Sequence, residues 1–209
     1  NPFKITSEVA SKYVKRSLTF AHKLALENSD SGIINCAINK KLLSKNNIGV
    51  TEFLAKKCNV KNNSEVMLIT NEELSVSPIT THINIKQVSS KIKSVSIINK
   101  AKTIDLWFKK KFKRKPKIAI LGLNPHNGEF KKKSEEIKTI IPSIMKLKKL
   151  GLKVKGPLVS DTVFINDYKS YDVIIGMFHD QVLAPFKALF KFNAINITLG
   201  LKYLRISPD

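Results

Sequence analysis

The stretch from Leu121 to Glu129, LGLNPHNGE, contains a histidine in a setting suited to chemistry. Because proline, asparagine and glycine surround it, His126 is expected on a tight loop. The loop follows an apolar run at 117–121 that predicts a β-strand, and it precedes a helix start at Ser134. In open α/β sheets, ligands bind beyond the carboxyl ends of the strands. This loop is therefore a candidate part of a functional site.

Two further histidines, His82 and His179, stand in similar polar surroundings, and the whole chain has only four histidines. Neutral imidazole is the commonest protein ligand for metals, and three imidazoles can together hold a divalent ion. Each histidine taken alone is more simply explained as a structural residue. Their shared setting at strand ends instead predicts one metal site, made by His82, His126 and His179.

Apolar residues recur with helical and with strand spacing, and the two kinds of segment alternate along the chain. Helices are expected at residues 7–27, 51–57, 88–111, 134–150 and 183–190, with Thr51 as a helix N-cap. Strands are expected at residues 32–37, 66–70, 79–85, 118–123, 172–177 and 194–199. Strands separated by helices of this length predict βαβ units, a mainly parallel sheet and an α/β fold.

The composition bounds the kind of protein. The chain has 209 residues, of which 43% are hydrophobic, so it can bury a sizeable core. Its net charge of +21 invites a nucleic-acid partner, but only three of its 37 basic residues are arginines. Proteins that recognise bases or phosphate groups favour arginine, whose guanidinium donates two parallel hydrogen bonds. No nucleic-acid partner is therefore expected. Without a long apolar segment, a cytoplasmic location with no membrane partner is expected, with Cys36 and Cys58 reduced.

The sequence contains neither a Rossmann fingerprint nor a phosphate-binding P-loop. Two polar residues near the C-terminus are then of interest. Asn196 interrupts an apolar strand, so its side chain either caps a neighbouring loop or faces a ligand. Arg205 lies in a strand-like segment, where it could hold a phosphate or carboxylate or could form a surface ion pair.

Several blocks of the sequence together resemble the 4-hydroxythreonine-4-phosphate dehydrogenase family of vitamin B6 biosynthesis. They are GVTEF at 49–53, TTH at 80–82, GLNPH with GE at 122–129, GP and DTVF at 156–164, HDQ at 179–181, NITLGL at 196–201 and R with SPD at 205–209. The blocks follow in the family's order at similar spacing and cover nearly the whole chain. GLNPH, HDQ and NITLGL form a highly specific combination.

The resemblance implies a two-domain α/β/α architecture similar to the isocitrate and isopropylmalate dehydrogenases. It places the active site in the cleft, at a homodimer interface. It also implies that His82, His126 and His179 are the metal ligands, with His179 supplied by the partner subunit. Zinc, magnesium and cobalt are the expected metals. Residues 1–209 are then expected to be one incomplete dehydrogenase unit of interleaved subdomains, lacking about the first quarter and a final piece of the family.

The resemblance further implies oxidation of 4-phosphohydroxy-L-threonine by NAD, followed by loss of CO2 to give 3-amino-2-oxopropyl phosphate. Substrate-binding positions of the family fall on Thr51, Lys187, Asn196 and Arg205. Lys187 and Arg205 can hold anionic groups as a point charge and as a fork. Asp180 or Lys187 could transfer the proton. The divalent metal would act as a Lewis acid.

One residue departs from the family, whose GHTE motif has a histidine at the position of Val50. If nothing replaces that histidine, Val50→His is expected to lower the KM by about ten-fold, since a hydrogen bond to a charged group contributes about 1.5–3 kcal/mol. The departure keeps two alternatives open. One is a sister dehydrogenase acting on 4-phospho-threonate or a related phosphorylated sugar acid. The other is an inactive metal-binding fragment.

Overall fold

The computed structural model describes residues 4–28, 31–43, 49–60, 64–165 and 167–208. Its α-helices are α1 (Ser7–Glu27), α2 (Val50–Lys57), α3 (Val88–Lys91), α4 (Ser94–Phe112), α5 (Ile141–Lys149), α6 (Ser160–Val163) and α7 (His179–Phe190). Its strands are β1 (Gly32–Ile34), β2 (Val66–Thr70), β3 (Ser75–Thr80), β4 (Ile118–Leu121), β5 (Val154–Leu158), β6 (Val173–Phe178), β7 (Ile195–Leu199) and β8 (Leu204–Pro208).

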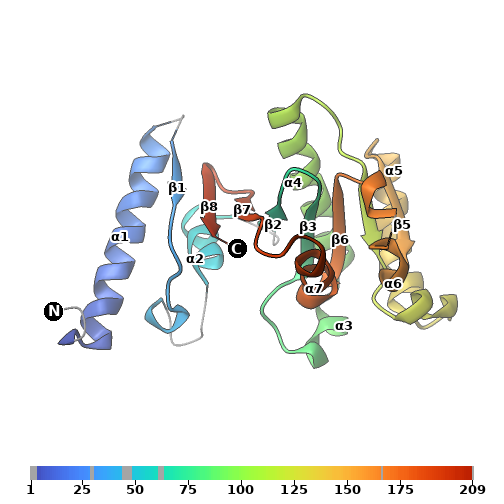
Figure 1. The fold of residues 1–209 in the computed structure, drawn as a ribbon, viewed down its shortest axis with the longest axis horizontal. Helices are drawn as coiled ribbons and strands as arrows, with labels where there is room; N and C mark the ends of the chain where they lie inside the picture. Colours follow the sequence, from blue (N-terminus) through green and yellow to red (C-terminus); the bar gives the residue numbers. More distant parts are fainter. Residues whose placement is uncertain (1–3, 29–30, 44–48, 61–63, 166, 209) are drawn as a thin grey trace.

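One eight-stranded sheet, in the order β1-β8-β7-β2-β3-β6-β4-β5, runs through the molecule (Figure 1). The pairs β1·β8, β3·β6, β4·β6 and β4·β5 are parallel, whereas β2·β3, β2·β7 and β7·β8 are antiparallel. The expected α/β fold with a mainly parallel sheet is confirmed. Strand β5 was not expected from the sequence. The division into interleaved subdomains stays a prediction.

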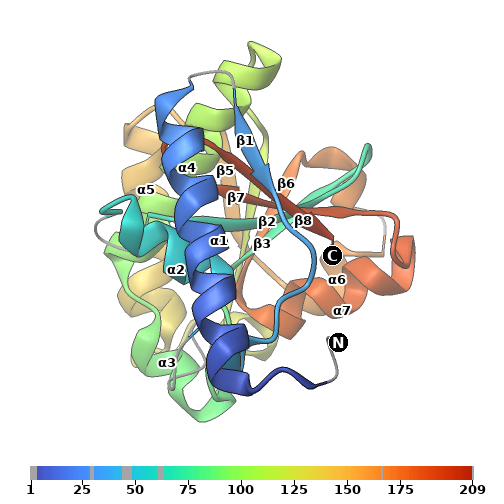
Figure 2. The ribbon, with the colours of Figure 1, turned by 90° about the vertical axis from the view of Figure 1, so that its left-hand side faces the viewer.

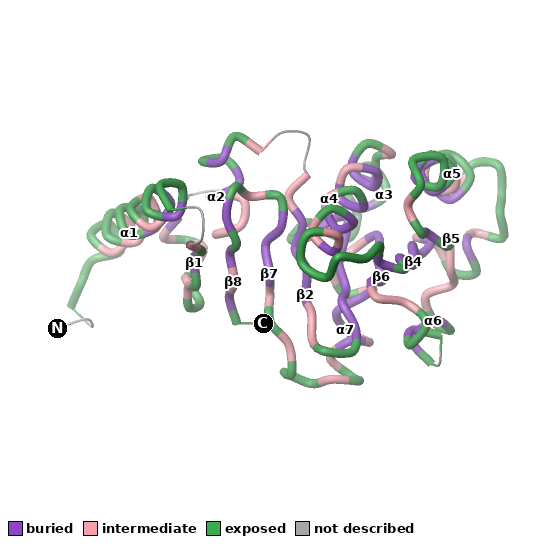
Figure 3. The backbone as a smooth tube through the Cα atoms, turned by 90° about the horizontal axis from the view of Figure 1, so that it is seen from above, coloured by how far each residue is buried: buried purple, intermediate pink, exposed green. Residues whose placement is uncertain are grey.

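Helices cover both faces of the sheet, and the strands between them are buried (Figure 3). Strand β4 contributes apolar side chains to the cores on both faces of the sheet, because alternate side chains of a strand point to opposite faces. Ile118 and Ile120 belong to the cluster under α3, α4 and α5, whereas Ala119 and Leu121 belong to the cluster under α6 and α7. A strand buried on both faces explains the continuous apolar run in the sequence.

At the other end of the sheet, α1 and α2 pack beside β1 and β8 (Figure 2). Their shared cluster contains Ala25 of α1, Ile33 of β1, and Leu54 and Cys58 from α2 and its C-cap. Helix α1 has the expected bounds, and the Thr6 hydroxyl accepts a hydrogen bond from its first turn. Among the described helices, none is long and apolar enough to cross a membrane.

Three expected helices differ in their extent. In the segment expected at 134–150, a π-helix at Glu136–Ile140 precedes α5, which begins at Ile141. The helix expected at 88–111 is divided, because Ile92 and Lys93 have extended backbone conformations between α3 and α4. Helix α7 begins at His179 rather than near residue 183, so the HDQ block forms its first turn. The expected N-cap of α2 was wrong as well. Gly49 is the N-cap, and Thr51 lies in the first turn, where its hydroxyl is free to contact other elements.

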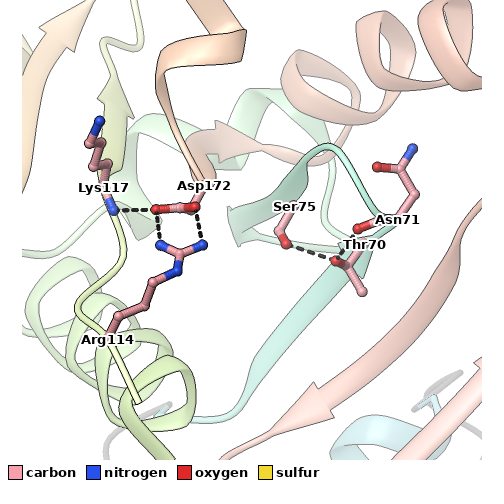
Figure 4. Close-up of polar contacts among 6 residues, drawn as sticks. All are labelled: Thr70, Asn71, Ser75, Arg114, Lys117 and Asp172. Atoms are coloured by element: carbon pink, nitrogen blue, oxygen red, sulfur yellow. Dashed lines mark hydrogen bonds and ion pairs between the residues drawn. The ribbon is translucent and has the colours of Figure 1, made fainter. Parts of the chain in front are cut away.

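The strand expected at 79–85 was misplaced, because a tight turn begins β3 earlier. The Asn71 side-chain oxygen accepts hydrogen bonds from the backbone of Glu73 and Leu74, both at 2.9 Å. The hydroxyls of Thr70 and Ser75 lie 2.8 Å apart across this turn (Figure 4). The turn returns the chain antiparallel to β2, and β3 then ends at Thr80.

Asp172, just before β6, ties the end of α4 to the sheet (Figure 4). Arg114 donates two hydrogen bonds to its carboxylate, at 2.8 and 2.6 Å, and the Lys117 backbone N–H donates a third at 2.7 Å. The hydrogen bonds from Arg114 outweigh the effect of burial, so the pKa of Asp172 lies below its ordinary value.

Replacing Asp172 with Asn is expected to destabilise the fold at neutral pH. The expected loss is about 1–2 kcal/mol, since charged hydrogen bonds contribute about 1.5–3 kcal/mol and solvent screens the half-exposed Arg114. The native-state pKa of the carboxyl is depressed, so its stabilisation is present above the unfolded pKa and lost as pH falls through the folded pKa. Urea titrations at several pH values should show the two proteins converging in acid. A constant difference at all pH values would contradict this account.

Candidate active site

Three parallel strands carry the histidine-bearing segments to one edge of the sheet. Strands β3, β6 and β4 are neighbours and run in the same direction, so their carboxyl ends lie together. His82 follows β3 by two residues, His179 follows β6 directly, and the loop of His126 follows β4. The rings of His82 and His179 lie 5.6 Å apart, measured between their centroids. Residues almost one hundred positions apart therefore form one imidazole pair.

The neighbouring residue of the HDQ block orients His179. Asp180 Oδ1 lies 2.7 Å from His179 Nδ1, and its carboxylate is otherwise exposed to solvent. An ionised carboxylate only accepts hydrogen bonds, so this contact favours the tautomer with a proton on Nδ1, in which Nε2 can act as a ligand atom. Carboxylate–histidine pairs of this kind orient metal-binding imidazoles. Asp180 thus has a geometric role in addition to the proton transfer expected of it.

The surroundings of His82 favour its neutral form. Partial burial has the largest effect in lowering the pKa of His82, and the nearby Lys40 and His179 lower it further. The carboxylate of Glu52 opposes this change. A metal ligand must be unprotonated, so a lowered pKa suits the metal-binding role.

His126 does not join this pair in the way the sequence suggested. The resemblance implied that one chain supplies His82 and His126 and the partner subunit supplies His179, but the close pair in one chain is His82 with His179. His126 is exposed, and its backbone is left-handed, with φ 50°. Over the described ranges, no three histidine, cysteine or acidic side chains form a group that could hold a metal ion. A site of three histidines therefore stays a proposal.

A buried glutamate holds the backbone of the His126 loop. Glu136 is completely buried, and its Oε1 accepts hydrogen bonds from the backbone N–H groups of Leu123 and Asn124, both at 2.8 Å. Burial alone would raise the pKa of Glu136, but these bonds and those from the Asn124 side chain outweigh it and lower the pKa. Gly122 is required here, because a Cβ at this position would lie 2.2 Å from the side-chain oxygen of Asn127.

A second group of polar residues surrounds Arg205, whose side chain is buried between β8, β7 and α2. Its guanidinium donates to Thr198 Oγ1 at 3.1 Å and to Asn35 Oδ1 at 2.8 Å, and it lies 3.5 Å from Thr51 Oγ1. Burial lowers the pKa of Arg205, and Glu52 opposes that change. Thus the expected substrate residues Thr51 and Arg205 are in contact, and the surface ion pair considered for Arg205 is excluded.

The other two expected substrate residues, Asn196 and Lys187, lie on β7 and α7. Asn196 lies two residues before Thr198 on β7, so both side chains point to the same face of the sheet. Its side-chain oxygen is buried without a hydrogen-bond partner, which leaves an acceptor for a ligand group. Lys187 is half-buried in α7, and its ammonium group lies 5.3 Å from the ring centre of Phe192. The last residue of the SPD block, Asp209, lies outside the described residues.

Sequence reasoning missed two charged residues near these groups, Glu52 and Lys100. Glu52 influences the pKa of His82, of Arg205 and of Lys100, a buried lysine of α4. One oxygen of Glu52 is buried without a hydrogen-bond partner. Burial lowers the pKa of Lys100, with Glu65 and Glu52 opposing. The sequence could have indicated Glu52, because it follows Thr51 in the GVTEF block. Nothing in the helical pattern around Lys100 indicated that this lysine is buried.

The fourth histidine belongs to the packing between α1 and β8. His22 is buried, and its Nδ1 lies 2.8 Å from the hydroxyl of Tyr203. The thiol of Cys58 lies 4.0 Å from the same nitrogen. Both Cys36 and Cys58 are free, as the sequence suggested, although Cys36 is exposed.

Comparisons with known proteins identify the family of this chain. Residues 2–209 match the family described as pyridoxal phosphate biosynthetic protein PdxA. The 4-hydroxythreonine-4-phosphate dehydrogenase of Aquifex aeolicus is 43% identical over 189 residues, which are 88% of this chain and 58% of that protein. The enzyme of the same name from Sulfurihydrogenibium is 41% identical over 196 residues, covering 90% of this chain and 59% of the relative.

Solved structures agree in fold. The crystal structure of 4-hydroxythreonine-4-phosphate dehydrogenase from Klebsiella pneumoniae is 32% identical and superposes with a TM-score of 0.84 over 97% of this chain and 63% of its own. A phosphotransacetylase from Staphylococcus aureus, 13% identical with a TM-score of 0.56, shares the fold alone. The chain spans about three fifths of the length of the curated relatives it matches. It belongs to the family of the pyridoxal phosphate biosynthetic protein PdxA.

Proposed function

We propose that the full-length protein is a metal-dependent dehydrogenase that oxidises 4-phosphohydroxy-L-threonine with NAD and releases CO2 to give 3-amino-2-oxopropyl phosphate. The observation that carries the proposal is the pairing of His82 with His179 at 5.6 Å, at the same sheet edge as the GLNPH loop. Relatives with 43% and 41% identity bear the name of this enzyme. The reaction belongs to pyridoxal phosphate biosynthesis, and a cytoplasmic location is proposed with it.

The histidines fit zinc or cobalt better than magnesium, because imidazole nitrogen suits these transition metals and magnesium prefers oxygen ligands. Asp180 holds His179 with one nitrogen available, and the lowered pKa of His82 favours its neutral form. A bound divalent ion supplies Lewis-acid stabilisation of negative charge on a substrate oxygen. We propose that the three histidines complete the site in a homodimer, in which one subunit supplies two of them and the partner subunit supplies the third.

The second group of residues fits an anionic substrate. Arg205 is buried, and its guanidinium can donate paired hydrogen bonds to the oxygens of a phosphate or carboxylate. Thr51 and Asn196 can add a hydroxyl and an amide beside it. Because Asp180 is bonded to His179, Lys187 is the better of the two candidates for proton transfer.

An assay of the full-length protein with NAD and a divalent metal tests the proposal. NADH formation with 4-phosphohydroxy-L-threonine, and little with 4-phospho-threonate, is the expected result. Preference for 4-phospho-threonate would favour the sister dehydrogenase, which is the second candidate because Val50 replaces a histidine of the family motif. No turnover of either substrate, together with retained metal binding, would favour the inactive metal-binding protein.

The structure changes the expectation for Val50→His. Val50 packs against the apolar cluster that contains Ala25, Leu54 and Cys58, so an imidazole there would contact hydrocarbon. We now expect the substitution to destabilise the fold by about 1 kcal/mol, with no gain in substrate affinity, since it partly buries an unpaired polar ring. Thermal unfolding and KM measured on one preparation check this. A ten-fold lower KM with an unchanged Tm would show that the histidine reaches the substrate.

A further inference from the structure

Gln181, the last residue of the HDQ block, uses its whole side-chain amide inside the protein. Its Oε1 accepts a hydrogen bond from the Met177 backbone N–H at 2.6 Å. Its Nε2 donates to the Gly122 carbonyl oxygen and to Ser160 Oγ, both at 2.7 Å. The amide has one acceptor oxygen and two N–H donors, so each group has a partner, and the orientation of the amide is fixed.

The sequence makes room for this side chain. Gly176, in β6, faces Gln181, and a Cβ on this glycine would lie 2.9 Å from Gln181 Oε1 and 2.5 Å from a methyl group of Val182. Any side chain at position 176 would therefore displace the amide. The glycine of the strand and the glutamine of the following helix form one local unit.

The three partners of Gln181 belong to three different segments. Met177 is the penultimate residue of β6, the strand that leads into His179. Gly122 begins the GLNPH loop that leads to His126, and Ser160 begins α6. Gln181 itself lies only two residues after His179, in the first turn of α7. One amide thus joins the two segments that carry these histidines, although they are more than fifty residues apart in the sequence.

Glutamate and methionine could not replace it. A carboxylate of the same shape would still accept from Met177 but would set an oxygen against the Gly122 carbonyl oxygen, and a thioether would make none of the three strong bonds. The next two residues of the loop are held separately, because Glu136 accepts hydrogen bonds from the backbone N–H groups of Leu123 and Asn124. Gln181 and Glu136 therefore fix successive residues of the loop.

We propose that Gln181 is a positioning residue of the histidine site, which holds the GLNPH loop in register with the first turn of α7. The inference rests on the proposed metal-dependent function, in which His126 and His179 of one chain are both ligands, each in one of the two sites of the homodimer. Residues beyond the ligands that orient metal-binding groups commonly change metal affinity by about 10–100-fold when they are replaced. Gln181 touches neither metal nor substrate in this account, so its effect passes through the two histidine segments.

The test compares Gln181→Glu with the unchanged protein in two measurements on the full chain. Hydrogen exchange of the metal-free protein is expected to become faster in residues 122–130 and at Met177. Affinity for Co²⁺, measured by its absorption spectrum in competition with a chelator, is expected to fall about 10–100-fold. Ser160→Ala removes one of the three hydrogen bonds and is expected to shift both measurements in the same direction by a smaller amount. This milder variant tests the inference even if Gln181→Glu does not fold.

Two control variants separate positioning from general effects. Asp172→Asn loosens the opposite end of the same strand, and Gln87→Glu places the same new charge on the exposed turn before α3. Both should leave the Co²⁺ affinity and the exchange of 122–130 unchanged. Unchanged exchange in Gln181→Glu and Ser160→Ala, or equal loss of affinity in Asp172→Asn, would overturn the inference. If the unchanged protein bound no Co²⁺, the proposed function would fail, and the exchange data alone would decide whether Gln181 holds the loop.

Discussion

Replacing His179 with alanine is expected to remove divalent-metal binding and, in the full-length protein, metal-dependent turnover. His179 is one of the two imidazoles that meet in the chain, and its Nδ1 is already engaged by Asp180. Loss of a direct ligand should weaken Co²⁺ binding by more than the 10–100-fold typical of outer residues. Because Lewis-acid stabilisation is worth several kcal/mol, kcat should fall by about a thousand-fold or more.

A histidine outside the site provides the control. His22 is buried, with its Nδ1 2.8 Å from the hydroxyl of Tyr203, and it lies in the packing of α1. His22→Gln is expected to lower the Tm but to keep the metal affinity. Equal metal binding by the unchanged protein and His179→Ala would remove His179 from the site. Equal losses in both variants would point to unfolding rather than to ligation.

The second large effect is expected for Arg205→Lys. This substitution keeps the positive charge but removes the planar guanidinium, which can donate two parallel hydrogen bonds. The guanidinium reaches Asn35, Thr51 and Thr198 from a side chain that is only 4% exposed. A lysine ammonium cannot reproduce these directions. Breaking a buried, hydrogen-bonded charge contact costs about 2–5 kcal/mol, so loss of the proposed contact between Arg205 and the substrate anion should lower kcat/KM at least about 30-fold.

Most of that loss should come from KM, because Arg205 is proposed to hold the anionic substrate. Inhibition by inorganic phosphate, measured in the same assay, should weaken in parallel. Arg16→Lys on exposed α1 makes the same change of side chain where no site is proposed, and it should behave like the unchanged protein. A loss of kcat with unchanged KM and unchanged phosphate inhibition would mean that Arg205 only supports the fold.

Many local features followed from the sequence alone. The bounds of α1 and β2 agree with the helical and strand patterns, because amphipathic spacing reports which face of a segment is buried. The α/β class followed from the alternation of these segments. The blocks around His82, His126 and His179 also identified the family correctly, since a combination of short motifs in a fixed order is specific where each one alone is not.

Features that depend on partners distant in sequence were not readable in this way. The start of α7 at His179, the break at Ile92 and the position of β3 depend on which strand or helix lies next to them. Apolar periodicity reports burial and does not report the neighbour. The same limit explains Lys100, whose burial in α4 no spacing could indicate.

The sequence by itself determined the chemistry available to this protein, namely three histidines in polar loops, a rare arginine and a set of family motifs. The tertiary structure decided which of them meet. It paired His82 with His179, buried Arg205 beside Thr51, and turned Val50 towards hydrocarbon. The physical reason is the sheet order, because parallel neighbours bring their carboxyl ends to one edge, and that order is set by packing over the whole chain.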